Sequence, residues 1–421
     1  MVDPRPELLS PNRFNIMPGI GVDPQHYSPP PGSNSVPMSR SRLSRRNLLP
    51  LAGLLLPVSR RLVGGKAAQS PSPSGGDDTK SLQAAIDRLK PGGILDGNGC
   101  QFTVTRLNLR PEMTFRNFKL HAKGTRTPLD AVLTIDGNAS PAHDIVIQDV
   151  TIDGNRSAQS NLTSEEDGGR DGIRIVGKAE RLLIANCSAV NCGTDGIKIF
   201  SDKSLSGNDA NLTFRDIYVT GCRFLGNRRH GASGDSLRNV HFIDCEFSGN
   251  GTEVEGGRTE GARGAIDEGA IYGAGVDIEG YGVGSGVDGL YFIRCKATQN
   301  ARFGFQFWEP TPPSRSGFAP RRKIVFEHCT IDGGVSPRHG HQALELSQPK
   351  PIRGSQPTYE DVQIIGLNCS GTVILNGVSR VLFAGGNYNS PYAGFWGIGE
   401  HCSDVSFLGV ETGGKTFRFR R

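Results

Sequence analysis

Two carboxylates, Asp277 and Glu279, lie two residues apart in the stretch GAGVDIEG, between apolar residues and glycines. If this stretch is a β-strand, both side chains project from the same face, because side chains alternate along a strand. Two carboxyl groups that flank a glycosidic bond can cleave it, one as acid and the other as base or nucleophile. On a sheet with one solvated face, the same pair would be ordinary surface. The surrounding elements must decide between these interpretations.

A repeat runs through the chain on both sides of this stretch. Each copy has an alternating apolar run, a cysteine, a second short run and then an x-Gly pair that opens another alternating run. Three short strands in a repeat of about 22–24 residues predict an all-β fold, a single-stranded right-handed parallel β-helix, whose coils stack into one core. One repeat position holds Cys187, Cys222, Cys245, Cys295 and Cys329, and another holds Asn191, Asn227, Asn250 and Asn300.

The cysteines are expected to pack in a buried column. Their total of nine is odd, and neither a CxxC pair nor a Cys/His metal-ligand spacing occurs. Disulfides are the alternative in an exported protein, but small apolar residues that stack on their own kind explain the repeat position better. The asparagines are expected to satisfy backbone groups at a bend.

A short amphipathic helix is predicted over 77–89, with Leu82, Ala85, Ile86 and Leu89 on one face. The strand GGILDGNG follows it, so the helix is placed to cap the open end of the solenoid. A helix, such a strand and then coils resemble the pectate-lyase-like superfamily of polysaccharide lyases, polygalacturonase-type hydrolases, mannuronan epimerases and phage tailspike depolymerases. The resemblance extends from about residue 76 to the end and implies the fold, with polysaccharides as the substrate class. GTDGIKI and RHG match fragments of the polygalacturonase pattern, but its paired aspartates and Arg-x-Lys element are missing in the expected order, so its residues are not transferred.

Aligned on the x-Gly pair, the third strands present two outward columns. Residues three and five of each row are mostly apolar and are expected to face the core, which leaves residues four and six outside. The first column is Arg174, Lys198, Ser233, Asp277, Gln306, Glu345 and Ile374, and the second is Val176, Phe200, Asp235, Glu279, Trp308, Ser347 and Asn376.

These columns predict a catalytic cluster of Asp277, Glu279 and Asp235. Adjacent coils are about 4.8 Å apart, which places Asp235 about 5 Å from Glu279, and i,i+2 neighbours on a strand are about 6.5–7 Å apart. Three carboxyl groups this close cannot all ionise freely, so the pKa of at least one should rise, as a general acid requires.

The surrounding residues predict a glycan site. Flat aromatic rings can contact sugar faces, and cations can bind acidic groups on a polymer. Insertions at 201–215, 251–272, 309–321 and 348–358 are expected to wall a groove. The expected substrate-binding residues are Arg174, Lys198, Phe200, Arg229, His230, Trp308 and Glu345. The aromatics could instead be secondary core beneath the inserted loops, and His230 could bond the backbone at a turn.

Residues 1–69 differ from the rest. Arg45 and Arg46 precede a short apolar run, which indicates a twin-arginine export signal behind a disordered leader and a periplasmic or secreted location; an uncleaved anchor is the alternative. Met38 is a second candidate start. The predicted domains are this leader, a cap with the first coils over 70–125, and the β-helix over 126–421. No membrane span is expected after signal removal.

The leader also accounts for the formal net charge of +5. Nine of the 47 Lys and Arg and three of the 42 Asp and Glu lie in it, so the exported part carries 38 and 39. A nearly neutral chain gives no support to nucleic-acid binding.

Three functions fit these residues. The favoured one is an exported glycoside hydrolase that acts on a polysaccharide and needs no metal or other cofactor. A lyase or uronate epimerase would need a base to take a proton and a group to neutralise the uronate carboxylate. The residues that could take part are Lys198, Arg228, Arg229, His230, Tyr272 and Tyr281. A calcium ion held by Asp235, Asp277 and Glu279 could neutralise the carboxylate instead. The third is a surface β-helix that binds glycan without cutting it. Homo-oligomerisation is left open.

Overall fold

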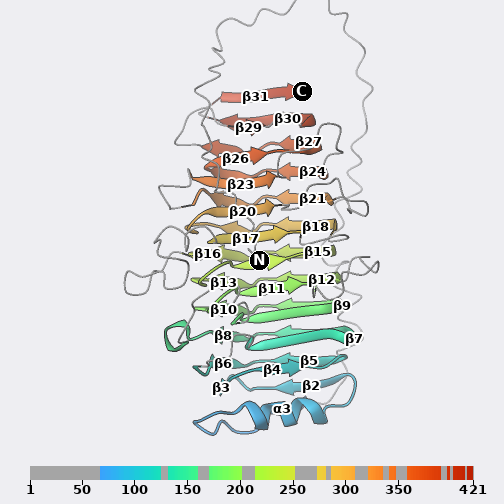
Figure 1. Cartoon of the computed structure of the whole chain (residues 1–421), viewed down its shortest axis with the longest axis vertical. Helices are drawn as coiled ribbons and strands as arrows, with labels where there is room; N and C mark the ends of the chain where they lie inside the picture. Colours follow the sequence, from blue (N-terminus) through green and yellow to red (C-terminus); the bar gives the residue numbers. More distant parts are fainter. Residues whose placement is uncertain are drawn as a thin grey trace, which may run out of the picture. The chain divides into compact units, whose positions relative to one another are not determined.

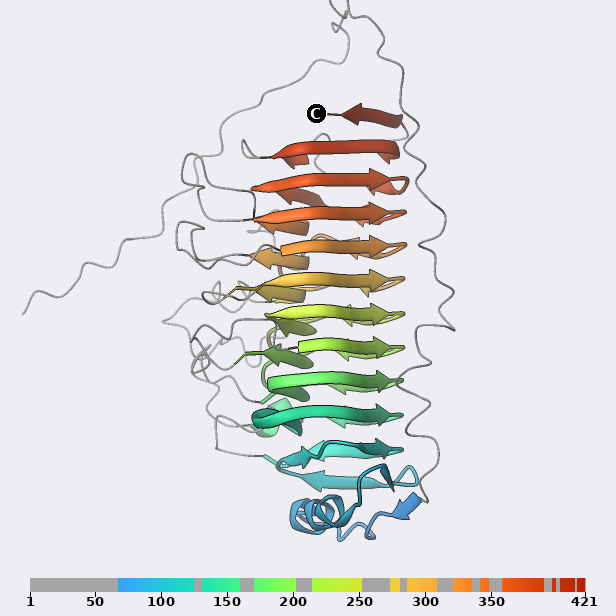
Figure 2. The ribbon, with the colours of Figure 1, turned by 90° about the vertical axis from the view of Figure 1, so that its right-hand side faces the viewer.

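The computed structural model is a stack of three-stranded coils (Figures 1 and 2). It describes residues 67–124, 131–159, 170–201, 214–251, 273–280, 286–308, 321–334, 341–347, 358–389, 396–398, 402–412 and 415–420. The 31 strands in these ranges belong to one sheet. All their pairings are parallel except that of β30 with β31, which is antiparallel. The predicted all-β parallel β-helix is therefore confirmed.

From β10 onward, most strands pair with the strand three places further along the chain, which is the signature of a three-faced coil. The first face contains β11 (Ile197–Phe200), β14 (Ala232–Gly234), β17 (Ala274–Glu279), β20 (Phe303–Trp308), β23 (Gln342–Ser347), β26 (Thr372–Leu375) and β29 (Trp396–Ile398). The second contains β12 (Phe214–Thr220), β15 (Leu237–Ile243), β18 (Val287–Ile293), β21 (Arg321–Glu327), β24 (Tyr359–Ile365), β27 (Val378–Ala384) and β30 (Ser403–Thr412). The third contains β10 (Ser188–Val190), β13 (Arg223–Leu225), β16 (Glu246–Ser248), β19 (Lys296–Ala297), β22 (Thr330–Asp332), β25 (Asn368–Ser370) and β28 (Asn387–Asn389).

The N-terminal coils are built from β1 to β9 and one capping helix. The helix α3 covers Thr79–Arg88, within the predicted 77–89, and buries Leu82, Ala85 and Ile86. The strands are β1 (Ala67–Gln69), β2 (Gly93–Asp96), β3 (Gln101–Val104), β4 (Leu107–Leu109), β5 (Met113–Arg116), β6 (Lys119–Ala122), β7 (Leu133–Gln148), β8 (Thr151–Asp153) and β9 (Ile173–Ala185), with a 3-10 turn at Arg156–Ala158. Since β1 pairs with β2, the folded sheet begins three residues inside the segment predicted as leader.

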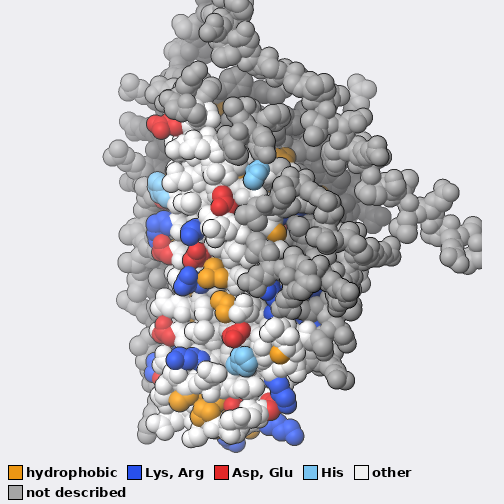
Figure 3. Space-filling model, turned by 90° about the vertical axis from the view of Figure 1, so that its left-hand side faces the viewer, with side chains coloured by type: hydrophobic (Ala, Val, Ile, Leu, Met, Phe, Trp, Pro, Cys, Tyr) orange, Lys and Arg blue, Asp and Glu red, His pale blue; other side chains and the backbone are white. Residues whose placement is uncertain are grey.

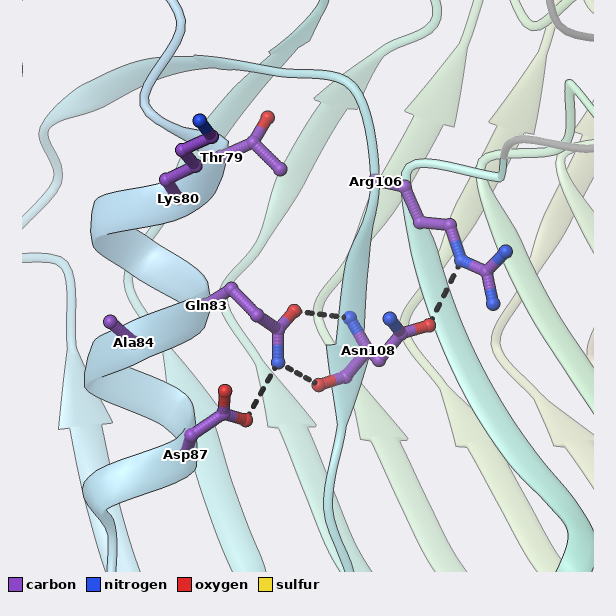
Figure 4. Close-up of a pocket in the computed structure, with 7 residues that line it drawn as sticks. All are labelled: Thr79, Lys80, Gln83, Ala84, Asp87, Arg106 and Asn108. Atoms are coloured by element: carbon purple, nitrogen blue, oxygen red, sulfur yellow. Dashed lines mark hydrogen bonds between the residues drawn. The ribbon is translucent and has the colours of Figure 1, made fainter.

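The side chain of Gln83 on the capping helix forms hydrogen bonds with the backbone of β4 (Figure 4). The Gln83 amide donates to the Asn108 carbonyl at 3.1 Å and accepts from the Asn108 N–H at 2.8 Å. Arg106 in turn donates to the Asn108 side chain at 2.9 Å. The helix thus satisfies backbone groups of β4 that no lower coil could reach, which is how a solenoid end avoids exposed strand edges.

The core consists of stacked columns of identical or similar side chains. The five predicted cysteines are buried, and all nine cysteines of the chain are free thiols, which confirms the ladder and not the disulfide alternative. Phenylalanines form a second column, in which Phe292 stacks between Phe242 and Phe326 at centroid distances of 5.2 and 5.3 Å. Each such contact contributes about 0.5–1.5 kcal/mol beyond burial.

The asparagine column forms a hydrogen-bonded ladder, although with one member fewer than predicted. Asn250 Oδ1 accepts from the backbone N–H of Asn227 at 3.0 Å, and Asn300 Oδ1 accepts from that of Asn250 at 3.0 Å. The prediction was wrong for Asn191, which is exposed, because the ladder ends on the N–H of Cys192. This register also places Cys192 in the core.

Glycines of the x-Gly pairs make room for this ladder. A Cβ on Gly275 would lie 2.6 Å from the carbonyl oxygen of Gly304 and 2.8 Å from the side-chain nitrogen of Asn300. Gly231 meets the same obstacle, with the side-chain nitrogen of Asn250 at 2.9 Å. The repeated x-Gly signal therefore reflects close packing against the asparagines.

Acidic and basic side chains are interspersed on the face of the stack in Figure 3. Oppositely charged side chains of neighbouring coils also form ion pairs, such as that of Glu246 with Lys296 at 3.1 Å and with Arg223 at 3.3 Å. Within the described ranges, no helix is long and apolar enough to cross a membrane.

Candidate active site

The strand register of the first face brings the two predicted columns together. In the first column, consecutive coils pair Arg174 with Lys198, Lys198 with Ser233, and Ser233 with Asp277. The same column continues through Gln306, Glu345 and Ile374. In the second column, Glu279 pairs with Trp308 and Trp308 with Ser347. The sequence alignment of these strands is thus confirmed.

The columns point away from the core, yet most of their members are covered. Asp277 and Asp235 are only 3% and 6% exposed, and Glu279 is half-buried. Trp308 is the exception at 37% exposed. These low exposures show that this face is not a solvated sheet. Its buried carboxyl groups must therefore be neutral or compensated.

A third column, which the sequence analysis did not identify, lies just before the first residues of the strands of this face. The backbone N–H of Asp195 donates to the Asp171 carboxylate at 3.2 Å, and that of His230 donates to the Asp195 carboxylate at 3.2 Å. The N–H of Ala274 then donates to His230 Nδ1 at 3.1 Å. Each side chain therefore links its coil to the next. The signal was present in the residue before each x-Gly glycine, which is Asp, Asp and His in three successive rows.

This link fixes the tautomer of His230 beside Asp277. Because Nδ1 accepts the Ala274 N–H, the proton of the neutral ring is on Nε2, 3.2 Å from Asp277 Oδ2 but not aligned as a hydrogen bond. Burial lowers the pKa of His230 to about 3, so the ring is neutral at pH 7. His230 is only 1% exposed and lies against Asp277, and its contact with substrate stays a prediction.

The carboxyl groups on β17 have unequal environments. Burial, and next the charge of Glu279, raise the pKa of Asp277 well above its usual range. Burial also raises the pKa of Glu279, but Arg229 and Arg321 oppose this rise. The two pKa values are therefore both raised, and only that of Glu279 is opposed by two neighbouring guanidinium groups. Within the described residues, Asp277 Oδ1 is buried and has no hydrogen-bond partner.

Asp195 is the member of the site whose pKa is lowered by its neighbours. It is fully buried, and burial disfavours its charge, but Arg229 and its other neighbours hold its pKa well below the usual range. Arg229 Nε lies 3.6 Å from its carboxylate, and the Ser233 hydroxyl donates to it at 2.6 Å. The predicted cation Arg229 is thus placed next to the acidic cluster.

Solved structures of low sequence identity share this architecture. No protein-family model matches the sequence, and no curated protein matches it. The pre-mature gene product 12 of bacteriophage phi29 superposes with a TM-score of 0.52 at 15% identity, over 81% of this chain and 51% of its own. The Dettilon tailspike protein gives 0.52 at 12% identity, over 82% of this chain and 62% of its own. Pectate lyase Pel9A gives 0.47 at 12% identity, over 83% of this chain and 78% of its own.

The chain is a parallel β-helix protein. The match spans about half of the phi29 protein and less than two thirds of the tailspike. At these identities the similarity establishes the fold and leaves the reaction to the site.

Asp235 of this β-helix protein is bonded to the preceding coil. Its carboxylate accepts from the Ser201 N–H at 2.7 Å and from the Ser201 hydroxyl at 3.1 Å. Burial raises its pKa to about 6. Strand β14 ends at Gly234, so the predicted pairing of Asp235 with Glu279 in one column is not part of the ladder.

Asp235→Asn should stabilise the protein above pH 6 and not near pH 4. The folded state binds the Asp235 proton more tightly than the unfolded state, so ionisation costs stability as pH rises from about 4 through 6. An asparagine keeps the bond to the Ser201 N–H and removes this cost, which reaches at most about 3 kcal/mol. Urea unfolding at pH 4 and pH 8 measures the difference, with the exposed carboxylate variant Asp149→Asn as control. An equal effect of Asp235→Asn at both pH values would contradict the assignment.

The basic end of the columns is less available than predicted. The Arg174 guanidinium is buried and binds the Asp171 carboxylate through both Nε and Nη2 at 2.9 Å. Phe200 lies beneath two cations, with Arg174 Cζ 5.7 Å and Lys198 Nζ 5.0 Å from its ring centroid. Lys198, which is half-buried, remains the predicted cation best placed to meet a ligand.

The other end carries Trp308 and Glu345. Trp308 is exposed as predicted and follows Glu279 by one coil. Glu345 is half-buried and accepts from the Ser347 hydroxyl at 2.7 Å, and burial raises its pKa. This end of the site therefore offers an aromatic surface beside a half-buried carboxyl group.

The predicted groove walls at 201–215, 251–272, 309–321 and 348–358 lie outside the described residues except at their ends, and Tyr272 and Tyr281 lie outside them too. Among the described side chains, one set of three potential ligands has its atoms within 4.8 Å of one another, namely Glu112, His143 and Asp144. Asp144 of this set already binds Arg181 at 2.9 Å. The three carboxyl groups proposed for calcium are not such a set.

Proposed function

We propose that this β-helix protein hydrolyses a polysaccharide, with Asp277 as general acid and Glu279 as general base. The observation that carries the proposal is the register that places Asp277 and Glu279 on the outward face of β17, with Trp308 paired to Glu279 on the next coil. Burial raises the pKa of both carboxyl groups, and Arg229 and Arg321 oppose the rise at Glu279. Glycosidases need a pair of carboxyl groups, one protonated and one ionised. The β-helix fold shared with solved structures of a pectate lyase and a tailspike protein is consistent with it.

In this reaction, Asp277 gives its proton to the glycosidic oxygen as the bond from that oxygen to the anomeric carbon breaks. Glu279 takes a proton from the water whose oxygen bonds to that carbon. The two residues are separated by about 6.5–7 Å along the strand, which falls in the range for an inverting enzyme, since the water must fit between them. His230 orients the acid, and Arg229 stabilises the charge on the base.

The substrate would lie along the columns. Trp308 is exposed where a sugar ring could stack, and Lys198 lies two coils from Asp277, where an acidic group could bind. The proposal includes export through the N-terminal leader, since a polysaccharide substrate would be met outside the cell.

The test is incubation of the protein with acidic and neutral polysaccharides from bacteria and plants, with calcium or with chelator. Reducing ends and the ultraviolet absorbance of unsaturated uronates are followed together. New reducing ends without absorbance, unaffected by chelator, are expected. Absorbance that chelator abolishes would favour the lyase, and bound glycan with no new ends would favour a binding protein.

A further inference from the structure

A buried arginine lies behind the carboxyl pair. Arg321 is the first residue of β21 on the second face and is only 1% exposed. Its Nη1 donates to the carbonyl oxygen of Ile278 at 3.2 Å and to that of Trp308 at 3.5 Å. The same nitrogen lies 3.3 Å from the Tyr359 hydroxyl, and its guanidinium lies over the Tyr359 ring, 5.5 Å from the centroid.

These carbonyl groups belong to the residues that carry the site. Ile278 is the residue between Asp277 and Glu279, and Trp308 pairs with Glu279 in the sheet. The Tyr359 hydroxyl donates to the carbonyl of Ser347, the next member of the second column, at 3.1 Å. Arg321 and Tyr359 together therefore hold the ends of β17, β20 and β23, where the strands give way to the inserted segments.

Arg321 also places a charge beside Glu279. A guanidinium does not lose its proton in a protein, so this charge persists at every working pH. It opposes the rise in the pKa of Glu279 that burial produces. The other charged or titratable groups that face Glu279 are Asp195 and Lys198 from the preceding coils, Arg229 from the turn before β14, and Asp277 from its own strand.

We propose that Arg321 is a positioning residue that fixes the end of β17 and holds a positive charge beside Glu279, so that Glu279 acts as base and Asp277 as acid. This assignment of Arg321 rests on the proposed function. It assigns a catalytic consequence to a residue that lies on the second face of the coil.

The test compares three variants of the full chain. Arg321→Gln removes the charge and leaves a shorter polar side chain, Arg321→Lys keeps the charge but not the fork, and Tyr359→Phe removes only a hydroxyl. Carbon-13 labelled glutamate reports the titration of Glu279, assigned by its loss in Glu279→Gln, and the pH dependence of kcat is measured beside it. In Arg321→Gln, the pKa of Glu279 and the acidic limb of kcat should both rise by about one pH unit or more.

Arg321→Lys should leave the pKa of Glu279 unchanged and lower kcat about tenfold, because the end of β17 is held less accurately. Tyr359→Phe should lower stability without moving the titration. The proposal is overturned if a folded Arg321→Gln titrates Glu279 as the wild type does. If Arg321→Gln does not fold, a Lys variant indistinguishable from Tyr359→Phe in kcat and KM overturns it. Because the titration needs no substrate, failure of the hydrolase proposal would appear separately, as absence of cleavage in the wild type.

Discussion

Asp277→Asn is expected to lower kcat on the cleaved polysaccharide by about 100- to 10,000-fold, the usual contribution of a general acid. The amide cannot deliver a proton to the leaving oxygen, but it is nearly isosteric with the acid and carries no charge, as protonated Asp277 carries none. The folded state and KM should therefore change little. Glu279→Gln should lower kcat by a similar factor, because no base would then take the proton from the attacking water.

The control is Asp332→Asn. Asp332 is a half-buried carboxyl group on the third face, whose pKa burial also raises, and it accepts only from the backbone of Gln299 among the described residues. Its replacement should leave kcat within twofold. Full activity of Asp277→Asn would remove the acid from the proposed pair, whereas a loss that appears only in KM would make both carboxyl groups substrate contacts.

Asn250→Ala is expected to lower the free energy of unfolding by about 3 kcal/mol, because a buried donor or acceptor left unpaired costs about 1–3 kcal/mol. Asn250 is fully buried and stands in the middle of the ladder. Its loss would leave the N–H of Asn227 without an acceptor and the carbonyl of Phe224 without the 3.2 Å bond from Asn250 Nδ2. A cavity would add to this cost.

Urea unfolding followed by circular dichroism measures this change. Asn368→Ala is the matched control, since Asn368 is exposed on β25 and outside the ladder, and its effect should stay within about 0.5 kcal/mol. Equal effects of the two substitutions would show that the ladder does not stabilise the coils as its geometry indicates.

The fold could be predicted from the sequence because the solenoid repeats its own signals. The cysteines, the asparagines and the x-Gly pairs each mark one position of the coil, so their spacing sets the register of the sheet. That register brings Asp277, Glu279 and Trp308 onto one face. The error at Asn191 arose because the ladder bond falls on the N–H of the following residue, a shift of one position that composition does not reveal.

Burial and long-range partners could not be predicted in the same way. Strand parity shows that Asp277 faces away from the core, but not that neighbouring groups cover it. Arg321 approaches the site from another face of the coil, 44 residues after Asp277 in the chain. The link through Asp195 and His230 depends on side chains that accept backbone N–H groups of the next coil, and it is apparent only once the coils are stacked.

Cleavage in oxygen-18 water tests the central claim most directly. Hydrolysis by Asp277 and Glu279 predicts that each new reducing end carries one oxygen-18 atom, detected by mass spectrometry of the products, and that Asp277→Asn produces few such ends. Unsaturated products without the heavy isotope would contradict the account, since they would show that the glycosidic bond is broken by elimination and not by water.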